Sequence, residues 1–130
     1  MLEDICLVAT KDAPPAIGPY SQAVAAGPYL FLSGQIPLNP QTGKIVASDI
    51  ESQTQQVIDN IEAILAAKGL SLANVVRTEV YLKDMQDFIA MNTIYADRFK
   101  QAVKPARTTI QAANLPLDCL IEIACIAYCP

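Results

Sequence analysis

The spacing of the apolar residues changes along this chain, and that change most constrains the fold. From about Asp49 to Gly69 the apolar residues recur at helical spacing, and Gly69 supplies a stop. Over residues 75–83 a face that begins with Val76 and ends with Leu82 alternates with polar residues, which is typical of a strand with that face buried. A helix and a strand that each hide one face pack on each other, so the pattern predicts an α+β domain.

The remaining segments predict more strands and a second helix. Gly27-Pro28 separates two runs that are typical of a β-hairpin. Asp84 or Asp87 can cap a helix with an aromatic-rich apolar face. Strands are expected over residues 5–9, 20–26, 29–34, 106–112 and 118–128. Together these elements form one domain, residues 1–130, with a mixed β-sheet and two helices packed on one face.

The opposite face of this sheet has no helix to cover it. Hydrophobic residues make up 52% of the chain, which is above the roughly 45–50% of typical domains. A small domain has limited interior for such an excess, so part of it is expected to lie against another subunit. The composition therefore favours an oligomer.

The charge and hydropathy of the chain argue against two classes of partner. The net charge is −4 and Lys and Arg never cluster beyond a pair, which argues against nucleic acid. The chain has no apolar run of about 18 residues that could span a membrane. Its first segment, MLEDICLVAT, has acids where a signal peptide needs bases. We expect a soluble, cytoplasmic protein that binds no membrane.

The cysteines and the lack of histidine limit the chemistry. The usual zinc sites are not expected, because the chain has no histidine and no CxxC pair, and no metal is assigned. Any general acid or base must be Glu, Asp, Tyr, Cys, Lys or a chain terminus, which excludes Ser-His-Asp and Cys-His sites. The four thiols are expected to be buried and reduced: Cys6, Cys119, Cys125 and Cys129.

Two charged residues stand in the last two predicted strands, within KPARTTIQAANLPLDCLIEIACIAY (104–128). Burying an unpaired carboxylate costs several kcal/mol, so Glu122 is not there for packing. Arg107 shares a strand face with Thr109, and Glu122 shares one with Ala124. If the two strands lie near each other, guanidinium and carboxylate line one site. A structural ion pair between them is the alternative, and strand parity leaves both open.

Two further segments contain candidate ligand contacts. The segment LSGQIP (32–37) places Ser33 and Gly34 at a strand end, where a glycine can bring a backbone N–H close to a ligand carboxylate or oxyanion. The alternative is a turn glycine. Asn92 interrupts the apolar face of the second helix, and it is either a ligand contact or a local hydrogen-bonding residue.

Five segments together resemble the RidA/YjgF family of reactive-intermediate (enamine/imine) deaminases. In order and spacing they are AIGPYSQAV, LFLSGQIPLNPQTGKIV, DFIAMNTIYADRF, PARTTIQAANLP and IEIACIAY. The resemblance covers nearly the whole chain. It implies a chorismate-mutase-like fold and a homotrimer with three clefts at the subunit interfaces. Those clefts accept small 2-imino, 2-enamino or 2-keto acids, and no cofactor is needed.

The resemblance also implies roles for individual residues. Arg107 of PAR would bind the substrate carboxylate, and Glu122 of IEI would orient water. Many members have cysteine two residues after the arginine, whereas this chain has Thr109, whose N–H and hydroxyl could hold the carboxylate. The remaining implied substrate contacts are Tyr20 of GPY, Ser33 and Gly34 of SGQ, and Asn92.

The implied function is hydrolysis of reactive 2-enamino or 2-imino acids, such as 2-aminoacrylate and 2-iminopropionate, to 2-keto acids and ammonia. A bidentate arginine suits the carboxylate, and a glutamate with a raised pKa suits proton transfer and water. A non-catalytic module that binds keto or amino acids is the main alternative. A ribonuclease or translation inhibitor is less well supported, since the chain is acidic and lacks a basic or aromatic stacking surface.

Overall fold

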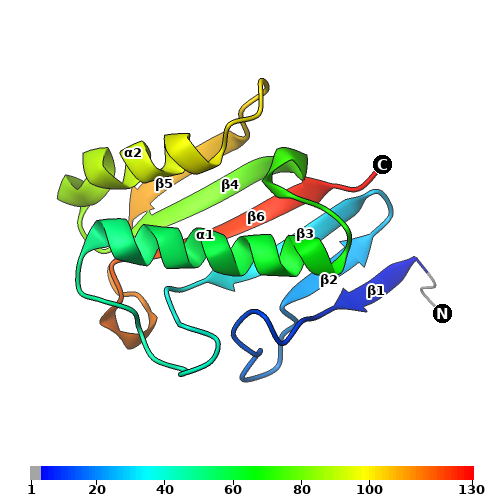
Figure 1. The fold of residues 1–130 in the computed structure, drawn as a ribbon, viewed down its shortest axis with the longest axis horizontal. Coiled ribbons are helices and arrows are strands. Elements are labelled where there is room, and N and C mark those ends of the chain that lie inside the picture. Colours follow the sequence, from blue (N-terminus) through cyan, green and yellow to red (C-terminus); the bar gives the residue numbers. More distant parts are fainter. Residues whose placement is uncertain (1–3) are drawn as a thin grey trace.

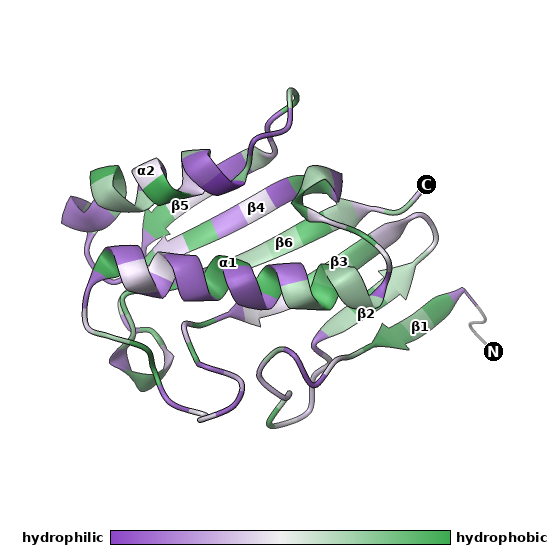
Figure 2. Ribbon diagram, in the orientation of Figure 1, coloured by the Kyte–Doolittle hydropathy of each residue, from purple (hydrophilic) through white to green (hydrophobic). Residues whose placement is uncertain are grey.

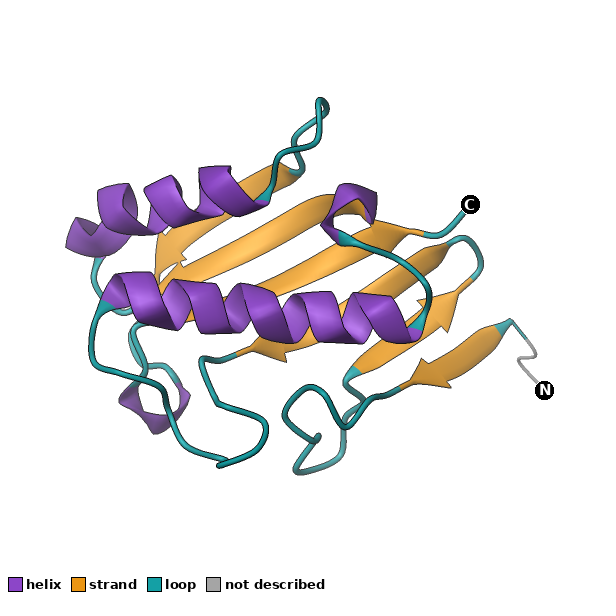
Figure 3. Ribbon diagram, in the orientation of Figure 1, coloured by secondary structure: helices purple, strands orange, loops and turns teal. Residues whose placement is uncertain are grey.

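Six strands form one mixed sheet, and both helices lie over the same face of it (Figure 1, Figure 3). The computed structural model describes residues 4–130, so Glu3 of the acidic N-terminal segment lies outside the described residues. The elements are β1 (Ile5–Val8), β2 (Ala23–Ala26), β3 (Tyr29–Gln35), α1 (Ile50–Ala67), β4 (Val75–Leu82), α2 (Phe88–Arg98), β5 (Ala106–Gln111) and β6 (Ile121–Tyr128). The predicted α+β class, with two helices on one face of a mixed sheet, is confirmed.

The strand order is β1-β2-β3-β6-β4-β5. Strands β4 and β5 pair in parallel, and the other neighbours pair antiparallel. Strand β4 therefore lies between β5 and β6, and the last two strands of the chain are not neighbours. β6 begins at Ile121 instead of residue 118, because residues 116–118 form a 3₁₀ turn in which Leu117 and Asp118 have positive φ. β2 likewise begins at Ala23, which leaves Tyr20 in the preceding loop.

Helix α1 begins and ends where the sequence predicts. The Asp49 carboxylate caps it by accepting a hydrogen bond from the backbone N–H of Ser52 at 2.8 Å. At the other end Gly69 has φ +74°, and the N–H of Leu70 donates to the carbonyl of Leu65 at 2.9 Å. The apolar face of α1 is fully buried against the sheet, through Val57, Ile58, Ile61, Ile64 and Leu65.

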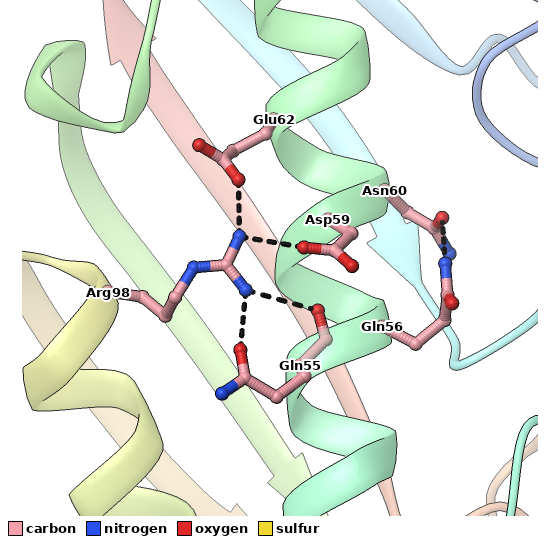
Figure 4. Close-up of polar contacts among 6 residues, drawn as sticks. All are labelled: Gln55, Gln56, Asp59, Asn60, Glu62 and Arg98. Carbon is pink, nitrogen blue, oxygen red and sulfur yellow. Dashed lines mark hydrogen bonds and ion pairs between the residues drawn. The ribbon is translucent and has the colours of Figure 1, made fainter.

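Helix α2 is anchored at its C-terminal end to α1 (Figure 4). Arg98 donates to Oε1 of Gln55 at 2.6 Å and forms ion pairs with Asp59, at 2.8 Å, and with Glu62. These contacts join the helix that carries Asn92 to the main helix of the domain. At the other end of α2, the two predicted cap residues occupy the N-cap positions of two consecutive elements. Asp84 caps a short 3₁₀ turn that leads into the helix, and Asp87 holds the N-cap position without a side-chain bond.

The burial of the central strands follows the predicted alternation with one exception. On β6 the residues beside Glu122 are buried toward the helices, and Glu122 shares the opposite face with Ala124. On β4 the prediction that Val76 points inward is wrong. Val75 is buried and Val76 is exposed, because the pairing with β6 shifts register between Val75 and Arg77.

All four cysteines are free thiols, and their burial differs from the prediction. Cys119 and Cys125 are buried, as expected, and desolvation raises their pKa values to about 11 and about 12. Cys6 is exposed and Cys129 is partly exposed, so the expectation of burial is wrong for these two. Cys6 lies on the edge strand β1, and Cys129 follows the last strand.

The face of the sheet opposite the helices is rich in large apolar side chains, and Figure 2 shows the hydrophobic character of β1, β3 and β6. We call it the helix-free face. The strand register places on it Ile5, Leu7, Tyr29, Phe31, Ile110 and Tyr128, each at least 42% exposed. The helix-free face is thus the uncovered apolar sheet face that the sequence predicts. Among residues 4–130, no helix has the length and apolar character needed to cross a membrane.

Candidate active site

Arg107 lies on β5 with its guanidinium against helix α2. Its Nη1 donates to Oδ1 of Asn92 at 2.7 Å. Its Cζ lies 4.7 Å from the ring centre of Tyr95 and 5.6 Å from that of Phe88. Within residues 4–130, no carboxylate forms an ion pair with it. The guanidinium is thus held by neutral groups and keeps N–H donors for an external anion.

Tyr95 is a fixed platform beneath this guanidinium. Its hydroxyl shares a buried hydrogen bond of 2.7 Å with the hydroxyl of Thr78, which is the register neighbour of Arg107 on β4. Its ring stacks on Phe99 with the centroids 4.4 Å apart. Burial raises the pKa of Tyr95, so the phenol stays neutral at physiological pH. The platform therefore adds no charge to the site.

A pocket of about 390 Å³ opens beside Arg107. Its size suits a small molecule. Its lining contains two cationic side chains, Lys104 and Arg107, and no acidic one. The other lining residues include Asn92, Tyr95, Phe99 and Pro105. The pocket is therefore suited to an anionic ligand. We call it the α2 pocket.

Thr109 follows Arg107 on the same face of β5, as the strand parity predicts. Its hydroxyl oxygen is buried and has no hydrogen-bond partner within the described part of the chain. Buried hydroxyls are normally satisfied, and leaving one without a partner costs about 1–3 kcal/mol. Thr109 thus has an unsatisfied hydroxyl on the strand face that carries Arg107, although it does not line the α2 pocket.

Glu122 projects from β6 on the helix-free face. Its side chain is about half buried, and desolvation raises the pKa of its carboxyl above the ordinary value of 4.5. No cation among residues 4–130 pairs with it. Tyr81 stands opposite Glu122 in the register, but the Tyr81 hydroxyl donates to Glu79 at 2.7 Å instead. Glu122 is thus a carboxyl with raised proton affinity and no counter-ion.

The carboxylate of Glu122 occupies the space that a side chain on Gly34 would fill. Strand β3 carries a bulge at Ser33 and Gly34, where two of its residues face one residue of β6. A Cβ atom on Gly34 would collide with Oε2 of Glu122 and would lie 2.9 Å from its Cδ. The alternative role of Gly34 as a turn residue is therefore wrong, because it lies inside β3 and its absent side chain admits the carboxylate.

Ser33 joins this bulge to the loop that carries Tyr20. The Ser33 hydroxyl donates to the carbonyl of Ser21 at 2.5 Å. Tyr20 is half exposed, and its hydroxyl accepts a hydrogen bond from the backbone N–H of Ile17 at 3.3 Å. A pocket of about 560 Å³ lies beside Tyr20 and is lined by residues 7, 9–11, 15–16 and 20–22. It is larger than the α2 pocket, but neither Arg107 nor Glu122 lines it.

The structure separates the predicted residues into two groups on opposite faces of the sheet. Asn92, Arg107 and Thr109 lie on the side of α2. Glu122 lies on the helix-free face with Gly34 beside it. Within one chain the two charges therefore form no ion pair and do not line one site, and a shared site between two subunits stays a prediction. The strand order separates them, since β4 lies between β5 and β6, and the register sets their faces, since Arg107 pairs with the buried Thr78 and Glu122 with Tyr81 on the other face.

Neither group resembles a metal site. Among residues 4–130, no three His, Cys, Asp or Glu side chains are close enough to hold a metal ion. The donors in both groups are a guanidinium, an amide, a hydroxyl and a single carboxyl. Such donors suit an organic anion and proton transfer.

A family model described as endoribonuclease L-PSP matches residues 10–129, which is nearly the whole chain. The protein belongs to the Rid (RidA/YjgF) family. A RutC family protein of Pyrococcus horikoshii is 54% identical over 122 residues, which cover 94% of this chain and 96% of the relative.

Two further comparisons bear on activity and fold. The Escherichia coli protein named 2-iminobutanoate/2-iminopropanoate deaminase is 45% identical, over 92% of this chain and 94% of its own length. A crystal structure of a Rid family protein from Yersinia pestis superposes with a TM-score of 0.93 at 44% identity, covering 95% of this chain and 98% of the other. The sequence-based assignment to the family and to its fold is thereby confirmed.

Sequence reasoning missed several residues that shape the site of this Rid family protein. The apolar pattern assigns Phe88 and Tyr95 only to the buried face of a helix, although they lie four residues before and three residues after Asn92. That spacing places them on one side of α2 with Asn92, and it could have indicated the platform. No sequence pattern marked Lys104. Gln22 was also missed, although its buried amide donates to the carbonyl of Pro14 at 2.7 Å and orders the loop before β2.

Proposed function

We propose that this Rid family protein hydrolyses small 2-imino and 2-enamino acids, such as 2-iminopropionate and 2-aminoacrylate, to 2-keto acids and ammonia. The observation that carries the proposal is the unpaired guanidinium of Arg107, which Asn92 and Tyr95 hold, on the strand face that also carries the unsatisfied hydroxyl of Thr109. A planar fork of N–H donors binds a carboxylate in bidentate fashion. The Escherichia coli relative, which is named for the same reaction, supports the proposal.

We further propose that the working site lies between subunits of a homotrimer. One chain would supply Arg107, Asn92 and Thr109, and its neighbour would supply Glu122 with Gly34, Ser33 and Tyr20. This arrangement accounts for two observations: the two groups lie on opposite faces of one sheet, and the helix-free face is apolar and uncovered. The site of one isolated chain is incomplete, because its base and its carboxylate clamp cannot meet.

In this mechanism Arg107 and Thr109 hold the substrate carboxylate and fix the position of the adjacent imine carbon. Glu122 takes a proton from water as the water oxygen bonds to that carbon, and the imine nitrogen is protonated. The carbon–nitrogen bond of the resulting carbinolamine then breaks, so that ammonia leaves and the keto acid remains. Water is the only co-reactant that the balance requires: one imine and one water give one keto acid and one ammonia.

The raised pKa of Glu122 fits this task. Burial raises the pKa of the Glu122 carboxyl, so this carboxyl accepts a proton from water more readily than an ordinary one. Imines hydrolyse readily even without an enzyme, so orientation of the reactants supplies the acceleration that is needed. Neither step needs histidine, of which the chain has none.

A coupled assay tests the proposal. A serine or threonine dehydratase generates the enamine, and semicarbazide traps the imine that remains. We expect the protein to lower the yield of semicarbazone and to raise the yield of free keto acid in proportion to its concentration. Binding of pyruvate without any such effect would refute the deaminase proposal and would favour the ligand-binding alternative. The net charge of −4 disfavours the RNA cleavage that the family description names.

A further inference from the structure

The α2 pocket holds a second cation that the proposed mechanism does not use. Lys104 lines it together with Arg107, and none of the other lining residues is acidic. Arg107 alone suffices to clamp one carboxylate. A second positive charge in the same pocket, in a chain whose net charge is −4, calls for its own explanation.

The position of Lys104 is set by the end of helix α2. Its Nζ donates to the carbonyl oxygen of Phe99 at 3.0 Å, and Phe99 is the C-cap residue of α2. The next residue, Pro105, is buried and fixes the chain where it enters β5. An ammonium group has three N–H donors, so this contact leaves two of them for another acceptor. No carboxylate among residues 4–130 forms an ion pair with Lys104.

We infer that the α2 pocket selects imino acids with a second carboxylate, and that Lys104 binds this distal group. Four- and five-carbon 2-imino dicarboxylic acids are the substrate class that matches two cations in a pocket of about 390 Å³. Arg107 holds the carboxylate next to the imine, and Lys104 holds the one at the far end. The inference rests on the proposed deaminase function and names its substrate class.

The reaction is the same hydrolysis with a longer substrate. 2-Iminosuccinate and water give oxaloacetate and ammonia, and 2-iminoglutarate and water give 2-oxoglutarate and ammonia. The class of reaction that must supply these substrates is oxidation of an amino dicarboxylic acid at its α-carbon. The carbon–nitrogen double bond forms in that step and is removed in this one.

Capping of α2 is the competing role for Lys104, since a lysine near a helix C-terminus interacts with the last carbonyl groups. The two roles predict different properties for a variant that lacks the lysine. Loss of a cap lowers the melting temperature and changes the activity toward all substrates by the same factor. Loss of a distal carboxylate contact changes the ratio of activities toward dicarboxylic and monocarboxylic imines.

The test compares the parent with Lys104→Met, Lys104→Arg and Lys100→Met. Lys100 is an exposed lysine in the same loop that does not line the pocket, so it is the matched control. An aspartate oxidase generates 2-iminosuccinate, an alanine-oxidising amino acid oxidase generates 2-iminopropionate, and catalase removes the peroxide. Semicarbazide trapping gives kcat/KM for both imines. The affinities for 2-oxoglutarate and pyruvate are measured in parallel by NMR titration.

We expect the parent to favour 2-iminosuccinate over 2-iminopropionate. Lys104→Met should lower that preference about five-fold, chiefly through KM, which corresponds to the loss of one exposed ion pair. Lys104→Arg should retain the preference, and Lys100→Met should match the parent. An unchanged ratio in Lys104→Met would overturn the inference. If neither imine is accelerated, the deaminase proposal fails instead. The relative affinities for 2-oxoglutarate and pyruvate in Lys104→Met then decide the role of Lys104 separately.

Discussion

Replacing Gly34 with alanine tests how closely turnover depends on the position of the Glu122 carboxylate. The new Cβ would lie 2.9 Å from Cδ of Glu122 and closer still to Oε2, whereas ordinary contacts are 3.4–4 Å. The carboxylate therefore has to move by about 1 Å, and a displacement of that size costs about 100-fold in rate. That loss corresponds to about 2.7 kcal/mol in the activation free energy.

The same substitution should have little effect on folding. The atoms that must move are at the end of a flexible, half-buried side chain, so we expect the free energy of unfolding to change by less than about 1 kcal/mol. Semicarbazide trapping gives the rate, and thermal unfolding gives the stability. Affinity for pyruvate should be retained, because the carboxylate clamp is formed by other residues.

Gly43→Ala is the matched control for Gly34→Ala. Gly43 has φ +70°, and a Cβ atom added there would have no neighbouring atom within 4 Å. Alanine at this position therefore strains the backbone by about 1–2 kcal/mol without touching the site. We expect a lower melting temperature and unchanged turnover, the reverse of the Gly34 result. Parental turnover in Gly34→Ala would refute the role given to the Glu122 carboxylate.

Three other perturbations act on the Glu122 carboxyl, the Tyr95 platform and the buried thiols. Glu122→Gln should abolish turnover while retaining pyruvate binding. Burial raises the pKa of the Glu122 carboxyl above 4.5, so burying its ionised form lowers the free energy of unfolding of the parent as pH rises through the raised pKa. The variant should therefore unfold no more easily than the parent at pH 7, and the difference in stability between the two should shrink in acid. Tyr95→Leu should weaken pyruvate binding more than Tyr95→Phe, since only leucine removes the ring beneath the Arg107 guanidinium, and NMR titration checks this. Mild alkylation at neutral pH should spare Cys119 and Cys125, whose pKa values are about 11 and about 12, and should leave turnover intact; mass spectrometry and the trapping assay read the two outcomes.

The local parts of this fold could be predicted from the sequence. The helical spacing from about Asp49 to Gly69 indicated the limits of α1, and the alternation around Glu122 indicated the correct face of β6. These features depend on contacts between residues close in sequence. The exposure of Val76 could not be predicted in this way, because the bulge that causes it depends on pairing with β6.

The arrangement of the site depends on strand order, which no local pattern contains. Arg107 and Glu122 were each correctly placed on a strand face, but parity cannot tell which strands are neighbours. β4 lies between β5 and β6, and its register with them puts Arg107 beside Thr78 on the helix side and Glu122 beside Tyr81 on the helix-free face. The aromatic platform under Arg107 likewise depends on how α2 packs over β5.

Complementation between two inactive variants tests most directly whether the site is shared between subunits. Arg107→Ala and Glu122→Gln are unfolded together in equal amounts and refolded, so that chains assort at random. In a three-fold ring about three quarters of the trimers contain both variants, and each of these has one intact cleft among its three. A shared site therefore predicts recovery of about a quarter of the parent's activity from two inactive proteins. No recovery, with mixed trimers present by native mass spectrometry, would contradict a site built from Arg107 of one chain and Glu122 of the next.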